Sequence, residues 1–191
     1  LQGGAIGLLD LTIFSALRLF GLLEAAPAFI MLLAVAALAA MLAVLQDALV
    51  LAVLGAVGGF LAPIIAATGA GNHVSLFAYY AVLNAGILAI AFFKAWRLLN
   101  LVGFVFTFAI ATVWGALRYR PEHFASTEPF LILFFLIYAA MPVLFARRAG
   151  GPRASRLDTT LVFALPLIAF GLQVELVRGF AYGSAWSALT L

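Results

Sequence analysis

Hydrophobic residues follow one another along this chain in runs of about 20, and short polar or glycine-rich breaks separate the runs. A run of this length can cross the hydrocarbon core of a bilayer as an α-helix, because a helix satisfies its backbone hydrogen bonds within the segment. The pattern therefore predicts an all-α, polytopic transmembrane helix bundle of about seven spans. The expected spans are residues 3–23, 27–45, 48–67, 74–93, 98–117, 130–145 and 159–177.

Prolines interrupt several of these runs. Pro63 lies inside the third expected span and Pro166 inside the seventh. A proline removes one backbone donor and crowds the carbonyl four residues before it, so kinked helices are expected. Pro129 is expected to begin the sixth span after an outer loop that starts at Arg118, and Pro142 is expected to bend or end that span.

The composition supports a membrane location. Of 191 residues, 67% are hydrophobic and only 9% are charged, whereas a soluble domain is about half apolar and about a quarter charged. We expect one transmembrane domain over residues 1–191, which is part of a longer multi-spanning chain whose other helices are its partners. The absence of cysteine excludes a disulfide, a thiolate nucleophile and a sulfur metal site.

The distribution of charge predicts an orientation. Basic residues are more frequent after the even-numbered spans (Lys94, Arg97, Arg147, Arg148, Arg153, Arg156) than on the other side (Arg18, Arg118, Arg120, Arg178). The positive-inside rule then puts the even-span loops in the cytoplasm and the loop that carries His73 outside. Lys94 and Arg97 flank a tryptophan, which is typical of an anchor at the lipid headgroups. The basic loops lack interleaved aromatic residues, so nucleic-acid binding is not expected.

The third expected span carries glycines and a proline close together. Gly55 and Gly59 form a GxxxG motif with Gly58 beside it, and Pro63 follows. Small residues at this spacing let two helices approach closely. The alternative is a broken helix whose freed carbonyls line a polar cavity, as in transporters.

Polar residues at the start of the fourth span offer a second candidate. Asn72 and His73 follow a glycine-rich loop. His73 is interpreted either as a turn or interfacial residue, or as a proton acceptor or metal ligand together with His123. The spacing of the two histidines matches no metal-binding signature, so neither a metal nor a cofactor is expected.

Three further polar residues lie inside expected spans. Tyr80 and Asn84 share one helix face, where they either bond neighbouring helices or line a substrate path. Asp10 is a carboxylate within an apolar run, which indicates function unless a membrane boundary lies nearby. A transport function would require Asp10, Gly59 and Asn84 to converge on one cavity.

Three segments together carry a family resemblance. They are residues 58–63 (GGFLAP), 71–79 (GNHVSLFAY) and 94–100 (KAWRLLN). The chain resembles a bacterial family of large multi-spanning predicted membrane proteins known only as a domain of unknown function. The resemblance implies a multi-helix protein of the inner membrane and implies no catalytic residues.

Three functions remain open at this point. The first is a transporter or flippase-like module, or a component of a cell-envelope assembly. The second is a membrane-embedded transferase that acts on lipid-linked or envelope substrates and groups His73, His123 and Glu122 or Glu128 at the outer face. The third is a structural scaffold. A non-enzymatic role and contact with membrane lipids are expected.

Overall fold

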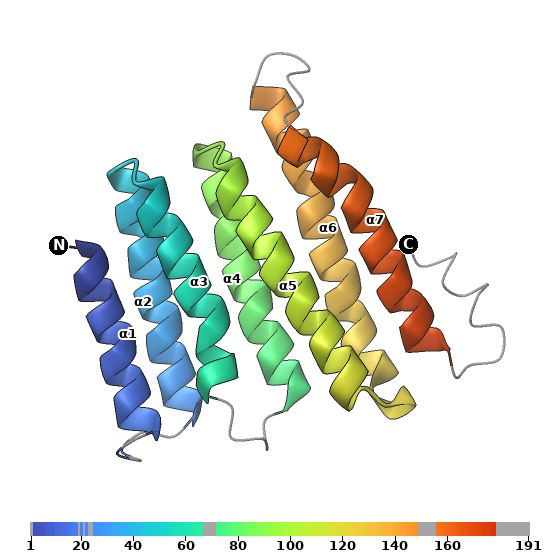
Figure 1. Cartoon of the computed structure of the whole chain (residues 1–191), viewed down its shortest axis with the longest axis horizontal. Helices are drawn as coiled ribbons and strands as arrows, with labels where there is room; N and C mark the ends of the chain where they lie inside the picture. Colours follow the sequence, from blue (N-terminus) through green and yellow to red (C-terminus); the bar gives the residue numbers. More distant parts are fainter. Residues whose placement is uncertain are drawn as a thin grey trace. The chain divides into compact units, whose positions relative to one another are not determined.

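A computed structural model describes residues 2–18, 20, 22, 25–66, 72–148 and 156–178. Within these residues the chain forms seven α-helices and one 3-10 turn, η1 (Figure 1). The elements are α1 (Gln2–Arg18), α2 (Ala25–Leu45), α3 (Leu49–Ala66), α4 (His73–Phe93), α5 (Arg97–Arg118), η1 (Pro121–His123), α6 (Phe124–Arg148) and α7 (Arg156–Val177). The expected all-α fold with one helix in each apolar run is confirmed.

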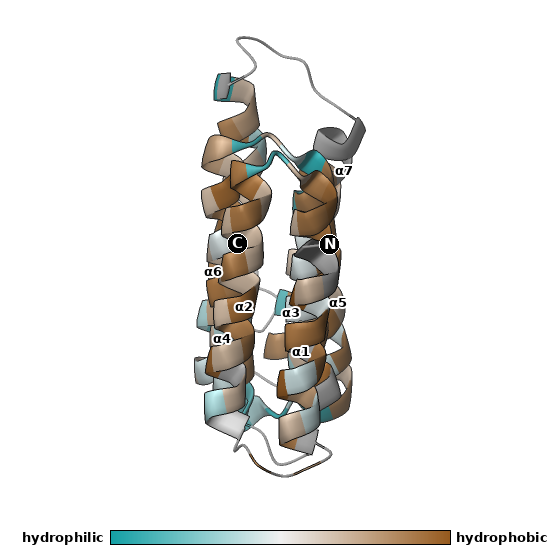
Figure 2. Ribbon diagram, turned by 90° about the vertical axis from the view of Figure 1, so that its left-hand side faces the viewer, coloured by the Kyte–Doolittle hydropathy of each residue, from teal (hydrophilic) through white to brown (hydrophobic). Residues whose placement is uncertain are grey.

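The helices have the apolar character that a bilayer requires. Three segments of the described residues are long and apolar enough to span it, namely His73–Phe93, Arg97–Arg118 and Pro121–Arg147. Shorter apolar helices cover Ala5–Leu17, Ile30–Leu45, Leu49–Ile64 and Leu161–Val177. Figure 2 shows hydrophobic residues along the helices and hydrophilic residues mainly near their ends.

The start of α6 differs from the sequence prediction. The expected loop from Arg118 to Pro129 is mostly helical, since η1 leads directly into α6 at Phe124. The Ser126 hydroxyl donates to the His123 carbonyl at 2.9 Å, which supports the first turn. A proline near a helix start costs only one intrahelical hydrogen bond, so Pro129 does not set the boundary. The helix also continues past Pro142.

The chain divides into two compact units, Leu1–Gly103 and Phe104–Leu191. In the first unit α1, α2 and α3 pack on one another, and α4 packs on α2 and α3. In the second unit α6 packs on α7 and on η1.

Small residues bring the helices of the first unit close together. A Cβ atom at Gly55 would lie 2.9 Å from the Cβ of Ala39 in α2. A Cβ atom at Gly59 would lie 3.3 Å from the Leu83 side chain in α4 and 3.7 Å from Ala36 in α2. Gly58 is half-buried in α3. One face of α3 therefore lies close to both α2 and α4. At Gly55 the distance to α2 leaves no room for a Cβ atom.

Candidate functional site

The proline in α3 leaves one carbonyl without its usual donor. Pro63 has no N–H, so the Gly59 carbonyl cannot make the intrahelical hydrogen bond that it would otherwise accept. The Tyr79 hydroxyl of α4 donates to this carbonyl instead, at 3.0 Å. Both residues are buried. The acceptor that Pro63 frees is thus satisfied by a side chain of the neighbouring helix, while α3 continues to Ala66.

The next tyrosine makes a parallel contact. The Tyr80 hydroxyl donates to the Phe60 carbonyl at 3.1 Å, and its ring stacks on Phe60 at 5.6 Å between centroids. Unlike Gly59, Phe60 keeps a helical donor, because Ile64 retains its N–H and α3 continues to Ala66. Tyr80 therefore adds a second hydrogen bond to an acceptor that is already satisfied.

Asn84 lies one turn beyond Tyr80 and is fully buried. Its Nδ2 donates to the Tyr80 carbonyl of its own helix at 2.8 Å. Gly59 thus meets α4 at Tyr79, whereas Asn84 is bound to Tyr80 within α4. Asp10 lies in α1, but its side chain is outside the described part of the chain.

The start of α4 is fixed by a side-chain cap. Asn72 is extended, and its Oδ1 accepts from the Val74 N–H at 2.9 Å. An asparagine at this position satisfies one of the N–H groups that a helix start leaves unpaired. His73 is the half-buried first residue of α4. Asn72 is therefore the N-cap residue of α4 and stabilises the start of this helix.

An ion pair joins two loops at the other end of the first unit. Asp47 follows α2 with a positive φ of 55°, which aspartate tolerates better than most residues. Its Oδ1 lies 2.7 Å from Nζ of Lys94, the residue that caps α4. Lys94, which the sequence assigned to the lipid interface, thus has a protein carboxylate as a partner. Arg97 is the half-buried first residue of α5.

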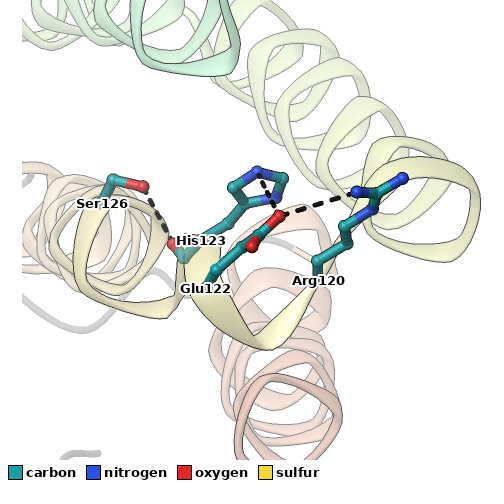
Figure 3. A network of polar contacts seen from close by, with 4 residues as sticks. All are labelled: Arg120, Glu122, His123 and Ser126. Carbon is teal, nitrogen blue, oxygen red and sulfur yellow. Dashed lines mark hydrogen bonds and ion pairs between the residues drawn. The ribbon is translucent and has the colours of Figure 1, made fainter.

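The second unit carries a polar network at the turn between α5 and α6 (Figure 3). An Oε1 atom of Glu122 lies 3.9 Å from His123 Nε2 and 3.7 Å from a guanidinium nitrogen of Arg120. The ring of His123 packs 6.0 Å from the ring of Trp114. Glu122 and Arg120 are mostly exposed, so these ion pairs contribute little to stability.

A second polar group links three helices near this turn. Gln173 of α7 is fully buried, and its Nε2 donates to Glu128 Oε1 of α6 at 2.8 Å. Tyr119, directly after α5, donates its hydroxyl to the Leu176 carbonyl of α7 at 2.6 Å. Burial, and next the charge of Glu128, raise the pKa of Tyr119 above its usual value of 10.0. The phenol is therefore neutral near pH 7 and able to donate.

Gln173 stands out in the sequence only as a polar residue near the end of the seventh expected span, and the sequence assigned no role to it or to Tyr119. Gln173 could have been noticed as an uncharged polar residue in an apolar run, as Asn84 was. Its partner Glu128 was named only as one member of a possible enzyme site. The same possible site includes His73 at the start of α4 and His123 in η1. In the described residues, no three His, Asp or Glu side chains form a group that could hold a metal ion.

Long apolar helices with polar ends define this chain as a multi-pass α-helical membrane protein. The chain belongs to the family described as predicted membrane protein (DUF2339), whose profile matches residues 1–191. The family resemblance seen in the sequence is thereby confirmed. No curated protein and no solved structure matches the chain.

Proposed function

We propose that the α2–α3–α4 group is a structural scaffold within a longer multi-spanning protein of the bacterial inner membrane, serving a cell-envelope assembly. The observation that carries this proposal is the hydrogen bond from Tyr79 to the Gly59 carbonyl. A broken helix that binds an ion or substrate must present its freed carbonyls to that ligand. Here the freed carbonyl accepts from a protein hydroxyl.

Neighbouring polar groups support the same role. Tyr80 donates to a backbone carbonyl of α3, and Asn84 donates within α4. Side-chain hydrogen bonds between membrane helices, such as that of Tyr80, contribute about 0.6 kcal/mol each on average. The close contact of Gly55 with Ala39 adds packing between α2 and α3. These interactions favour a rigid group of helices over an opening pathway.

A pair of substitutions in the full-length protein tests the scaffold. Tyr79→Phe removes the donor of the Gly59 carbonyl and should destabilise the protein by about 1–3 kcal/mol, the cost of an unsatisfied buried acceptor. Adding Pro63→Ala restores an N–H four residues after Gly59, so the double variant should recover most of the lost stability. Thermal unfolding in detergent and the protein level in membranes are the measurements.

The growth phenotype of a deletion strain under envelope stress distinguishes scaffold from transport. A scaffold predicts that the double variant recovers stability and complementation together. A transport pathway through the helix break predicts that Pro63→Ala abolishes complementation although stability is restored. That second result would overturn the proposal.

The proposed orientation puts the α5–α6 turn outside the cell and the loop after α6 in the cytoplasm, following the basic residues. Residues 1–191 contain no cysteine, so single cysteines introduced there report accessibility once any cysteine elsewhere in the full-length protein is replaced. The exposed residues Glu122 and Arg147 are suitable positions. In intact cells a membrane-impermeant maleimide should label Glu122→Cys and should leave Arg147→Cys unlabelled. The reverse pattern would invert the topology without affecting the scaffold.

A further inference from the structure

The Gln173–Glu128 pair presents hydrogen-bond acceptors that the described protein does not satisfy. Gln173 is fully buried, and its Oε1 has no hydrogen-bond partner in the described residues. Its other amide atom, Nε2, is bound to Glu128. Because a buried polar atom without a partner costs free energy, Gln173 Oε1 calls for a donor from elsewhere.

Glu128 adds a negative charge beside this amide. Its side chain is half-buried, and among the described residues it forms no ion pair with a lysine, arginine or histidine. Tyr119 lies close enough for the carboxylate charge to act on it, yet its hydroxyl proton is already donated to Leu176. Tyr119 therefore cannot serve as the missing donor. A partly buried carboxylate without a cation is unfavourable, so an external cation would stabilise this end of the unit.

Tyr119, on which the charge of Glu128 acts, has a second aromatic ring beside it. The rings of Trp114 and Tyr119 are 6.4 Å apart in a T-shaped arrangement. The faces of tryptophan and tyrosine attract cations, which adds to the attraction of the carboxylate. Tyr119 also lies between the apolar segments Arg97–Arg118 and Pro121–Arg147, and lipid headgroups are expected at such a junction between two spans.

We propose that Glu128, Gln173 Oε1 and the rings of Trp114 and Tyr119 bind a primary ammonium group, supplied by the headgroup of an aminophospholipid. An ammonium carries three N–H donors, which suits one carboxylate and one amide oxygen. Hard divalent cations take about six oxygen ligands, more than this pair supplies. The inference concerns the second unit and does not depend on the scaffold proposed for the first.

Lipid selectivity of the full-length protein tests the site. The protein is reconstituted in nanodiscs that contain equal parts of phosphatidylethanolamine, phosphatidylcholine and phosphatidylglycerol, and the retained lipids are counted by native mass spectrometry. Phosphatidylcholine is the matched competitor, because its quaternary ammonium has no N–H to donate. The wild-type protein should retain phosphatidylethanolamine over phosphatidylcholine by about tenfold, the ratio for one charged hydrogen bond.

Two substitutions should remove this preference, and one should keep it. Glu128→Gln removes the charge and Gln173→Leu removes the amide oxygen, so each should bring the ratio close to one. Glu122→Gln is the matched control, since Glu122 is an exposed carboxylate of the same turn. A wild-type protein without preference, or a preference that survives in both Glu128→Gln and Gln173→Leu, would overturn the site.

A second measurement keeps Glu128 and Gln173 unchanged, so it does not depend on the folding of the site variants. A full-length protein that keeps Trp114 as its one tryptophan, with Trp96→Phe, Trp186→Phe and any tryptophan outside residues 1–191 replaced by phenylalanine, is titrated in detergent with ethanolamine, choline or sodium chloride while its fluorescence is followed. Saturable quenching by ethanolamine alone supports an ammonium site that also accepts a free amine. Selectivity in nanodiscs without such quenching supports the lipid as the source. A response to sodium that equals or exceeds the response to ethanolamine contradicts the ammonium assignment.

Discussion

The α3–α4 pair and the α5–α6 turn with the end of α7 use similar side chains in opposite ways. In the first region Tyr79, Tyr80 and Asn84 all donate to backbone carbonyls of helices. In the second region Tyr119 also donates to a backbone carbonyl, but Gln173 and Glu128 bind each other and Gln173 Oε1 has no partner in the described residues. A polar side chain in a membrane helix thus stabilises the helix packing where a backbone carbonyl can accept its hydrogen bond. Where acceptors outnumber donors, as at Gln173 Oε1, one acceptor has no partner in the described residues.

The largest expected effect is steric and lies in the first region. Gly55→Ile would put a branched side chain where a Cβ atom alone already comes within 2.9 Å of Ala39. Because Ala39 is fully buried and cannot turn aside, α2 and α3 must separate, and overpacking of this kind costs about 1–3 kcal/mol or more. Thermal unfolding in detergent should show a clear loss of stability.

Gly86→Ala is the control for this substitution. A Cβ atom at Gly86 has nothing within 4 Å outside its own helix backbone, so stability should be unchanged or slightly higher. Equal losses in both variants would mean that the contact between Gly55 and Ala39 does not set the packing of α2 on α3.

The next effect separates the two tyrosines of α4. Tyr79→Phe leaves the Gly59 carbonyl without a donor, whereas Tyr80→Phe leaves Phe60 with its helical hydrogen bond. The first variant should therefore lose about 1–3 kcal/mol and the second only about 0.6 kcal/mol. Unfolding curves of both variants under one condition give the difference. Similar losses would show that Pro63 does not make the Gly59 carbonyl special.

A smaller effect is expected from Gln173→Leu in detergent that contains no amine lipid. The substitution removes a buried oxygen without a partner, and water can replace the lost N–H at the half-buried Glu128. The two changes offset each other, so stability should stay within about 0.5 kcal/mol of the wild type. A loss as large as that of Tyr79→Phe would make Gln173 a structural residue and would remove the contrast between the two regions.

The smallest effect is expected at the ion pair of the first unit. Lys94 and Asp47 have side chains that are 30% and 70% exposed, and exposed pairs contribute about 0–1 kcal/mol. A double-mutant cycle with Lys94→Ala and Asp47→Asn should give a coupling energy in this range that falls as salt is added. A larger, salt-independent coupling would make the pair part of the scaffold.

Much of the fold could be predicted from the runs of apolar residues. The bounds of α4 and α5 lie within one residue of the expected spans 74–93 and 98–117. The start of α6 could not be predicted in this way, since Pro129 was interpreted as its first residue. A proline near a helix start is compatible with several starting points, and the preceding η1 turn is determined by local hydrogen bonds.

The candidate site was predictable only in part. The sequence indicated Gly59 with Pro63 as a packing motif or helix break, and Tyr80 with Asn84 as one helix face. It did not identify Tyr79 as the donor to Gly59, since either tyrosine could have faced α3. It also did not connect Glu128 with Gln173, which are 45 residues apart.

The sequence by itself determined that this protein lies in a membrane and where its helices lie, because helix length and hydrophobicity are local properties matched to bilayer thickness. The tertiary structure alone decided which donor meets which acceptor. Hydrogen bonds between helices depend on the rotation and axial position of each helix, and these follow from side-chain packing across the interface. For that reason the carbonyl freed by Pro63 has a donor in Tyr79, whereas the side-chain oxygen of Gln173 has no partner in the described residues.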